Sequence, residues 1–555
     1  MSPRNFFDAA LSRRSFLQRV GVAGLAAGAV SPGLAAGSVA AQETPERREG
    51  GTIIYDVRQE GSHLVPPFSS FSTVIEPTVA FFSGLTQPGA DLTPEPDLAE
   101  SWEENEDGTH YVFHLREGVT FHDGQPFTAN DVKFTWELIA HPENLSSAQL
   151  FSFFQPITGA QAFRDGEAEE IEGITVVDDL TVEVTLDQPW APFLTIGSNQ
   201  YIVPRHILGE VPVSEILEHE YARNPVGTGP FRFVAWQAGD SYIGEAFEDY
   251  YAGRPAADTL VLRTSGLDDN GIITALRSGE LNAGKISLVG LDSLEGDPSI
   301  QIRQGPGLEN RYIEFNLAKP LFQDVNVRKA LSYALRRQEL VDAIWQGRAT
   351  IYNSPFPYDW DVTKTDTTLY DNDPEEAARL LDEAGWTLGD DGIREKDGEK
   401  FSFTLHTQSQ DWPLVIQQQW REAGIDAQVE YLDFPTLQSQ FYTTEVFDAI
   451  AMWVPYSYYT DPHYALPGYF LSANNRNSYE NPKSDELIMA AASTVDREER
   501  VRLYHEWQEV IAQDVPHLWI GNPDEVTAYS AGLVVPDLPT NYLRWRKVGD
   551  WFWSE

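Results

Sequence analysis

The sequence predicts a mixed α/β fold of more than one domain, and two observations carry that prediction. The first half contains short alternating segments joined in pairs by tight turns, which is typical of antiparallel hairpins. The second half contains a strand, a helix and a strand in succession, which is typical of a parallel pair. With 555 residues, 42% of them hydrophobic and 12% aromatic, the chain is long enough for about two to four packed domains.

Hairpins and one helix are expected in the first half. Thr52 to Val57 is expected to form a strand, and Asp107-Gly108 predicts a turn before an alternating run. Ile174 to Leu186 predicts two strands joined by a turn. Asn130 is expected to cap a helix. The buried face of that helix is predicted to carry residues spaced i, i+4, i+7: Val132, Trp136 and Ile139.

The stretch NPVGTGPFRFVAW, from Asn224 to Trp236, predicts a rigid turn that leads into a strand. Pro225 and Pro230 fix φ, while Gly227 and Gly229 permit positive φ. The strand is predicted to bury one face: Phe231, Phe233 and Ala235. Glycine pairs also occur in phosphate-binding loops, but no helix pattern and no Lys-Ser/Thr pair follows here, which favours a structural turn.

Helices are expected to dominate from about residue 325. One helix is predicted to end at Gly347, and Asp373 to Glu376 is typical of a helix start, with Gly385 closing that helix. The βαβ unit combines a strand at Phe401 to His406, a helix at Pro413 to Ala423 and a strand at Ala427 to Leu432. A last long helix is predicted at Asp496 to Gln513. The helix ending at Gly347 is expected to bury Val327, Leu331, Ala334 and Leu335.

Charge and cysteine content exclude several classes of function. Asp and Glu number 85 against 39 Lys and Arg, a net charge of −46, which argues against nucleic acid or an anionic membrane as the main partner. Such an excess favours adaptation to high ionic strength, with an ordinary acidic exported protein as the alternative. Because the chain contains no cysteine, it has no disulfide, no thiolate metal site and no lipid on an N-terminal cysteine.

The N-terminus resembles a twin-arginine export signal. Ser12-Arg13-Arg14-Ser15-Phe16-Leu17 precedes an uncharged run from Val20 to Val30, and Ser38-Val39-Ala40 resembles a cleavage site. Residues 1–41 are therefore interpreted as a signal peptide, cleaved near Ala40 or Ala41. No later segment reaches 18 apolar residues, so the rest is expected to be soluble and periplasmic or extracellular, near the cell surface.

Five blocks in a fixed order resemble one family. They are PDLAESW from Pro96, FHLREGVTFHDGQPFTANDVKFTWE from Phe113, ITVVDDLTVEVTL from Ile174, NPVGTGPFRFVAW from Asn224 and NVRKALSYALRRQELVDAI from Asn326. From about Gly51 onward the chain resembles the peptide-type solute-binding proteins of ABC importers, which include oligopeptide, dipeptide and nickel receptors. The resemblance implies a two-lobed α/β fold like that of periplasmic binding proteins, of the class II or cluster C type, with an inserted mixed α/β domain.

That resemblance also implies the domain boundaries and the function. Lobe I would comprise 46–83, 201–305 and 513–555, the inserted domain 84–200, and lobe II 306–512. The protein would be a receptor, expected to be monomeric, that captures a peptide or similar solute in an interlobe cleft and delivers it to membrane permease subunits. A receptor for short oligosaccharides is the alternative. The turn at Gly227 and Gly229 would belong to the scaffold of lobe I beside the cleft.

The ligand-binding residues are expected in MWVPYSYYTDPHYALPGYF, from Met452 to Phe470. In the resembled peptide receptors an Asp shortly after the Trp pairs with the α-amine of the ligand, whereas Tyr stands at the near-matching positions here. Aromatic rings with a polar edge suit sugars as well as peptides, and a purely structural role for them stays open. The candidate set is Trp453, Tyr456, Tyr458, Tyr459 and Asp461 from this stretch, together with Phe71 from the first part of the chain.

Other candidate chemistry is weaker. Phe121-His122-Asp123-Gly124 joins one His to one Asp without a third ligand or a nucleophile, and the resemblance makes it a turn. His206 and His219 lack metal spacing, so we assign no metal and no cofactor, with a nickel receptor as a minority alternative. No hydrolase motif occurs, neither a Gly-x-Ser-x-Gly elbow nor a His-Glu-x-x-His helix. The protein is therefore expected to be a receptor and not an enzyme.

Overall fold

A sheet of twelve strands forms the centre of the fold within the described residues. The structure is a computed structural model, and it describes residues 46–555 apart from 70–71, 295, 358, 410, 434–435, 438–446 and 455–460. Ten strands follow one another across the sheet in the order β20 (Asp426–Tyr431), β19 (Ser402–Thr407), β21 (Ala449–Trp453), β14 (Arg311–Phe315), β22 (His517–Ser530), β12 (Ala283–Ile286), β2 (Thr52–Asp56), β11 (Thr259–Arg263), β10 (Ser241–Ala246) and β9 (Phe231–Gln237). Two more, β13 (Ile300–Pro306) and β15 (Ala349–Thr350), pair with β22.

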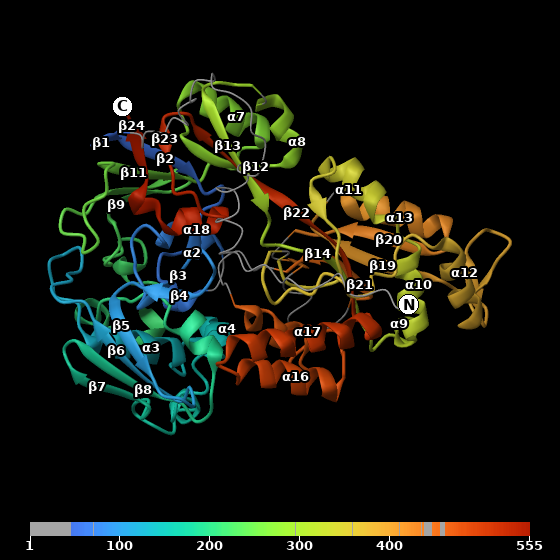
Figure 1. The fold of residues 1–555 in the computed structure, drawn as a ribbon, viewed down its shortest axis with the longest axis horizontal. Helices are drawn as coiled ribbons and strands as arrows, with labels where there is room; N and C mark the ends of the chain where they lie inside the picture. The colour runs from blue at the N-terminus through green and yellow to red at the C-terminus, as the bar shows by residue number, and fades with distance from the viewer. Residues whose placement is uncertain are drawn as a thin grey trace, which may run out of the picture. The chain divides into compact units, whose positions relative to one another are not determined.

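Strand β22 belongs to both halves of this sheet, as Figure 1 lets the reader follow. Its first residues pair antiparallel with β14, from His517 opposite Glu314 to Gly521 opposite Arg311. Its last residues pair antiparallel with β12 and β13. The chain between β13 and β14 makes the same passage, and a Cβ at Gly307 would lie 2.4 Å from the Pro523 carbonyl oxygen. Two backbones therefore cross from one half to the other in close contact.

Helices cover both faces of the sheet through apolar side chains. One face packs against α7 (Asp269–Ser278), α8 (Leu288–Leu291), α10 (Val325–Tyr333), α11 (Arg337–Trp345), α12 (Pro374–Glu383) and α13 (Trp412–Glu422). The other face packs against α16 (Pro482–Ala492), α17 (Arg497–Asp514) and α18 (Asn541–Arg546). The predicted parallel pair is present, because β19 and β20 pair in parallel on either side of α13 in the sequence.

A separate four-stranded antiparallel sheet lies in the segment predicted as the inserted domain. Its order is β5 (Ala99–Glu104), β6 (His110–Leu115), β8 (Thr181–Thr185) and β7 (Ile174–Asp178). Helix α3 (Ala129–Ala140) packs Val132, Trp136 and Ile139 into the core there, as expected. Smaller described elements are α2 (Ser72–Thr78), α4 (Ala148–Phe151), α5 (Ala160–Arg164), α6 (Arg205–Leu208), α9 (Pro320–Gln323), α15 (Leu466–Phe470), β1 (Arg47–Arg48), β3 (Thr86–Pro88), β4 (Pro94–Pro96), β16 (Thr387–Leu388), β17 (Arg394–Lys396), β18 (Glu399–Lys400), β23 (Leu533–Val534) and β24 (Phe552–Ser554).

Two helix predictions need correction. Helix α3 begins after Thr128, not Asn130, because the Asp131 carboxylate accepts from the Thr128 backbone N–H at 2.9 Å and forms a capping box with it. The single helix expected to end at Gly347 is two helices, α10 and α11, separated at residues 334–336. Over the described part of the chain, no helix is both long enough and apolar enough to span a bilayer.

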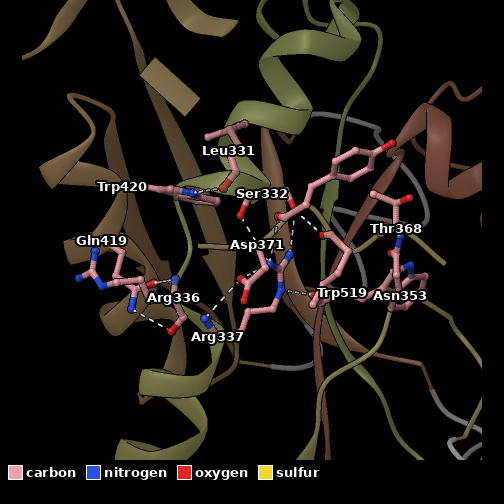
Figure 2. A network of polar contacts seen from close by, with 12 residues as sticks. Leu331, Ser332, Arg336, Arg337, Asn353, Thr368, Asp371, Gln419, Trp420 and Trp519 are labelled. Carbon is pink, nitrogen blue, oxygen red and sulfur yellow. Dashed lines mark hydrogen bonds and ion pairs between the residues drawn. The ribbon is translucent and has the colours of Figure 1, made fainter. Parts of the chain in front are cut away.

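Buried Arg337 holds the corner between α10 and α11, as Figure 2 shows. Its guanidinium donates to the Trp519 carbonyl at 2.7 Å and to Ser332 Oγ at 2.8 Å, and it pairs with Asp371 at 2.6 Å. Burial lowers the pKa of Arg337, and Asp371 counteracts that shift. The arginine thus ties strand β22 to the helices beside it.

Candidate functional site

Trp453 lies at the end of β21, beside the segments that cross between the two halves of the sheet. Its backbone is paired with Arg311 of β14, and the Arg311 guanidinium lies over its ring, 5.3 Å from the ring centre. The ring is half-buried. A tryptophan held by a cation–π contact at a partly open position can offer a flat apolar surface to a solute.

Charged side chains gather around the crossing. Arg311 forms an ion pair with Glu309 at 3.2 Å, and both side chains are partly exposed. Glu525, on β22, is half-buried and adjoins Glu309, Arg311 and Lys285. Burial raises the pKa of Glu525, while the neighbouring cations lower it. Lys285 in turn lies 3.6 Å from Glu76. The crossing therefore presents both signs of charge in a half-buried setting, which suits a polar solute.

Two buried amide side chains lie at the same place. Asn310 precedes Arg311 and is fully buried; its Nδ2 donates to the Ser354 carbonyl at 2.5 Å, while its Oδ1 finds no partner among the described residues. Asn522 is 1% exposed, and neither of its amide atoms has a partner in that part of the chain. Unsatisfied amides at this depth are costly, and water or a ligand can satisfy them.

Asp461 is engaged by protein partners on all sides. Arg500 of α17 binds its two carboxylate oxygens at 2.8 and 2.9 Å, and the Thr195 hydroxyl donates at 2.6 Å. The His463 backbone N–H donates at 2.8 Å. Burial would raise the pKa of this 1% exposed carboxyl, but Arg500 and these hydrogen bonds hold it below its usual range. In this structure the carboxylate thus joins α17 to the segment around Thr195.

The remaining predicted residues lie outside the described part of the chain. These are Tyr456, Tyr458, Tyr459 and Phe71. Their assignment as ligand-binding residues therefore stays a prediction. Described neighbours of that segment are packed on the segment predicted as the inserted domain: Tyr464 stacks on Phe153, and His463 meets Trp190 edge to face.

The His-Asp pair of the FHDG sequence has structural partners. The His122 ring accepts from the Gly227 N–H at 3.2 Å through Nδ1 and donates to the Gly229 carbonyl at 3.0 Å through Nε2. Asp123 pairs with His206 at 2.7 Å. Nowhere in the described chain do three His, Cys, Asp or Glu side chains gather as a metal site would require. His122 therefore joins the turn at residues 121–124 to the turn at Gly227 and Gly229.

Sequence reasoning did not select the charged residues at the crossing. In the sequence, more than 200 residues separate Glu309 and Arg311 from Glu525. Only strand pairing brings them together. No local spacing marks them. Glu309 and Arg311 flank Asn310 at the start of β14, a strand that was not among the predicted elements.

Comparison with known proteins identifies relatives over nearly the whole chain. Residues 93–477 match the family described as bacterial extracellular solute-binding proteins, family 5 Middle. The chain is 28% identical to the oligopeptide-binding protein AppA of Bacillus subtilis over 507 residues, which cover 89% of this chain and 90% of that protein. It is 29% identical to the glutathione-binding protein GsiB of Pectobacterium atrosepticum over 479 residues, covering 82% and 87% of the two chains.

A solved structure gives the same result for the fold. The structure of AppA from Bacillus subtilis, determined in complex with a nonapeptide, superposes with a TM-score of 0.78 at 27% identity. The match covers 92% of this chain and 100% of that one. The two-lobed α/β fold with an added domain, expected from the sequence, is confirmed by this likeness.

Proposed function

This chain belongs to the bacterial extracellular solute-binding proteins of family 5, and from that premise we propose that its solute is a peptide. Members of this family bind solutes for ABC importers and are not enzymes, so the expected receptor role is confirmed at that level. The relatives named for oligopeptides and for glutathione support a peptide, because both names denote chains of amino acids. A short oligosaccharide remains the alternative solute.

One observation carries this proposal: mixed charges and an aromatic ring converge where two backbones cross. A peptide has amide groups, charged ends and apolar side chains, and this region offers a counterpart to each. Arg311 and Glu309 provide opposite charges, Asn522 provides amide atoms without partners in the described chain, and Trp453 provides a ring face. A neutral sugar has no charged group to interact with these side chains.

We propose that the solute lies against Trp453, with Tyr456, Tyr458, Tyr459 and Phe71 as further contacts. Asp461 takes a different part in this proposal. Since Arg500, Thr195 and the His463 N–H already bind its carboxylate, Asp461 is expected to act by holding the aromatic segment in place. A solute amine would have to displace Arg500 to reach it.

Export and delivery complete the proposal. We propose that the twin arginines Arg13-Arg14 direct export by the twin-arginine pathway and that the bound form docks as a monomer on ABC permease subunits. The predicted lobe boundaries at 83, 200, 305 and 512 are part of the same proposal. Closure of the two halves about the crossing segments would give the permease a signal that solute is bound.

Native mass spectrometry of the freshly purified protein tests the solute. We expect bound masses that match short peptides and that fragment into amino acid residues. Calorimetric titration with defined nonapeptides and with short oligosaccharides then ranks the two classes. Saturable binding of an oligosaccharide without peptide binding would contradict the proposal. Chemical conversion of the added peptide or oligosaccharide would contradict the receptor role itself.

A further inference from the structure

Two neighbouring arginines lack acidic partners in a chain that has a large excess of acids. Within the described residues, neither Arg303 nor Arg544 forms an ion pair with a carboxylate, although Asp and Glu outnumber Lys and Arg by 85 to 39. The Nε atoms of both are buried and have no hydrogen-bond partner in that part of the chain. A buried guanidinium N–H without an acceptor is costly, and an anion that reached these Nε atoms would satisfy them.

Strand pairing and helix periodicity place the two arginines together. Arg303 of β13 lies directly opposite Thr527 of β22. The Thr527 hydroxyl donates to Asn541 Oδ1 at 2.9 Å, and Asn541 is one helical turn before Arg544 on α18. Helix α18 contacts β22, the strand with which β13 pairs.

The hydroxyl of Tyr529 lies near both guanidinium groups. Burial raises its pKa, and the charges of Arg544 and Arg303 both act against that rise. Arg544 is 5% exposed and is held by a bond from its Nη1 to the Leu538 carbonyl at 2.7 Å, whereas Arg303 is half-buried. One rigid and one accessible guanidinium therefore adjoin the same hydroxyl.

The surroundings favour a single negative charge. Glu525, two residues before Thr527, is a neighbour of Arg544, Arg311 and Lys285. Arg311 and Lys285 already have the acidic partners Glu309 and Glu76. The two arginines carry two positive charges, and the half-buried Glu525 balances one of them, so one bound monoanion would balance the other. Glu525 would repel a dianion such as phosphate more strongly than a monoanion. Paired guanidinium groups match the geometry of a carboxylate.

We propose that Arg303 and Arg544 form a binding site for a carboxylate group of the transported solute. Its residues come from β13, β22 and α18, so none of them belongs to the predicted aromatic segment at Met452 to Phe470. In naming the carboxylate as part of the solute, this inference rests on the proposed receptor function. The anion site itself does not depend on the class of solute.

Acetate is the direct probe of the anion site. Melting temperatures of the full chain are compared in sodium acetate and sodium chloride at the same sodium concentration, for wild type, Arg303→Gln and Arg277→Gln. Arg277 is the matched control, an exposed arginine of α7 that pairs with Asp297 at 2.9 Å. Acetate also changes the solvation of protein surfaces in general, and this effect on the melting temperature acts on all three proteins. Specific binding of acetate stabilises only the proteins that have the site.

We expect the gain in acetate over chloride to be roughly 2 °C or more larger for wild type and Arg277→Gln than for Arg303→Gln. Equal gains in all three proteins would overturn the anion site. Arg303 is the residue to change because its side chain is partly exposed, whereas replacing Arg544 would also remove the bond to Leu538.

A pair of nonapeptides tests the solute carboxylate. One has a free C-terminal carboxylate, the other a C-terminal amide, and neither contains Asp or Glu. We expect wild type and Arg277→Gln to bind the acid roughly ten- to a hundredfold more tightly than the amide, and Arg303→Gln to lose that preference.

The outcomes separate the two proposals. Equal binding of acid and amide by wild type would overturn the assignment to the solute carboxylate while leaving the peptide receptor intact. If wild type binds neither peptide, the peptide proposal fails, and the acetate comparison alone decides whether Arg303 and Arg544 bind anions.

Discussion

At the scale of single residues, Asp461 shows how a predicted contact can have a different chemical role. Its acidity and its place after four aromatic residues both fit a ligand contact. The structure instead gives it a bidentate bond with Arg500 and a bond from Thr195. The same carboxylate thus binds two distant segments of its own chain.

We predict that Asp461→Asn lowers the free energy of unfolding by about 3–5 kcal/mol, because it leaves the buried Arg500 guanidinium without its counter-charge. Asp366→Asn is the matched control; Asp366 is an exposed partner of Lys364, and its loss should cost less than about 1 kcal/mol. Denaturant titration of both variants gives the comparison. Similar free energies of unfolding for the two variants would show that the buried Asp461–Arg500 pair does not stabilise the fold more than an exposed pair does.

Trp453 is expected to act on binding and not on folding. Trp453→Ala removes a half-buried ring beside the crossing, so affinity for the solute found by native mass spectrometry should fall at least about tenfold. Trp236→Ala is the control. The Arg223 guanidinium lies over the Trp236 ring, 4.6 Å from its centre, so the contact is of the same kind, but Trp236 lies on β9 and away from β21 in the strand order. Calorimetry should find that control unchanged, and equal losses would remove Trp453 from the site.

His122 predicts a pH dependence of stability. Burial lowers the pKa of its imidazole to about 4, and the bond to the Gly229 carbonyl counteracts part of that shift. The folded protein keeps His122 neutral while the unfolded chain takes up a proton near pH 6.5, so stability is lost as the pH falls from 6.5 to about 4.

His122→Gln should therefore show a shallower fall in melting temperature than wild type over that range, although its stability at pH 7 is lower. Calorimetry at half-unit pH steps measures both slopes. Two parallel curves would mean that the imidazole is not held neutral by the fold.

At the scale of elements, the turn before β9 depends on close approach and not on an unusual backbone angle. Gly227 and Gly229 were expected to permit positive φ, but neither adopts it. A Cβ at Gly227 would lie 2.1 Å from the Phe81 carbonyl oxygen, and one at Gly229 would lie 2.5 Å from the Phe81 carbonyl carbon. The glycines are needed because another backbone lies directly against them.

We predict that Gly227→Ala costs at least about 1–3 kcal/mol of stability, since only backbone movement can relieve the overlap. Gly468→Ala is the control, because no atom lies within 4 Å of a Cβ there and φ is not positive. Thermal unfolding of the two variants should differ clearly. A tolerated alanine at Gly227 would show that the Phe81 segment can move away.

Local signals predicted the elements that local chemistry determines. Asp373 caps α12 as expected, because a capping side chain bonds the backbone within three residues. Asp496, the first residue of the last predicted helix, caps α17 in the same way. The break between α10 and α11 was missed, since Arg337 fixes it through Trp519, nearly two hundred residues away. The arginine pair and Glu525 were missed for the same reason: β13, β22 and α18 meet only in the folded chain.

At the scale of the whole molecule, the net charge of −46 sets the conditions under which the fold is stable. Like charges repel across a folded body unless salt screens them. The Debye length falls from roughly 30 Å at 0.01 M salt to about 3 Å at 1 M. We predict that the melting temperature rises steadily over that range.

Differential scanning calorimetry in sodium chloride and in potassium chloride measures this effect, and screening alone should give the same curve in both salts. A flat curve would mean that surface ion pairs already compensate the charge. A rise in only one salt would point to bound cations.

The passage of β22 through both halves of the sheet has a consequence for how the chain is made. β22 begins at His517, so it is synthesised after every other strand of the sheet. Until then β14 and β12 each present an open edge at the middle of the sheet, where aggregation through strand pairing is a hazard. Such late, distant pairing also slows folding. The two halves of the sheet therefore stay unjoined until β22 has been made.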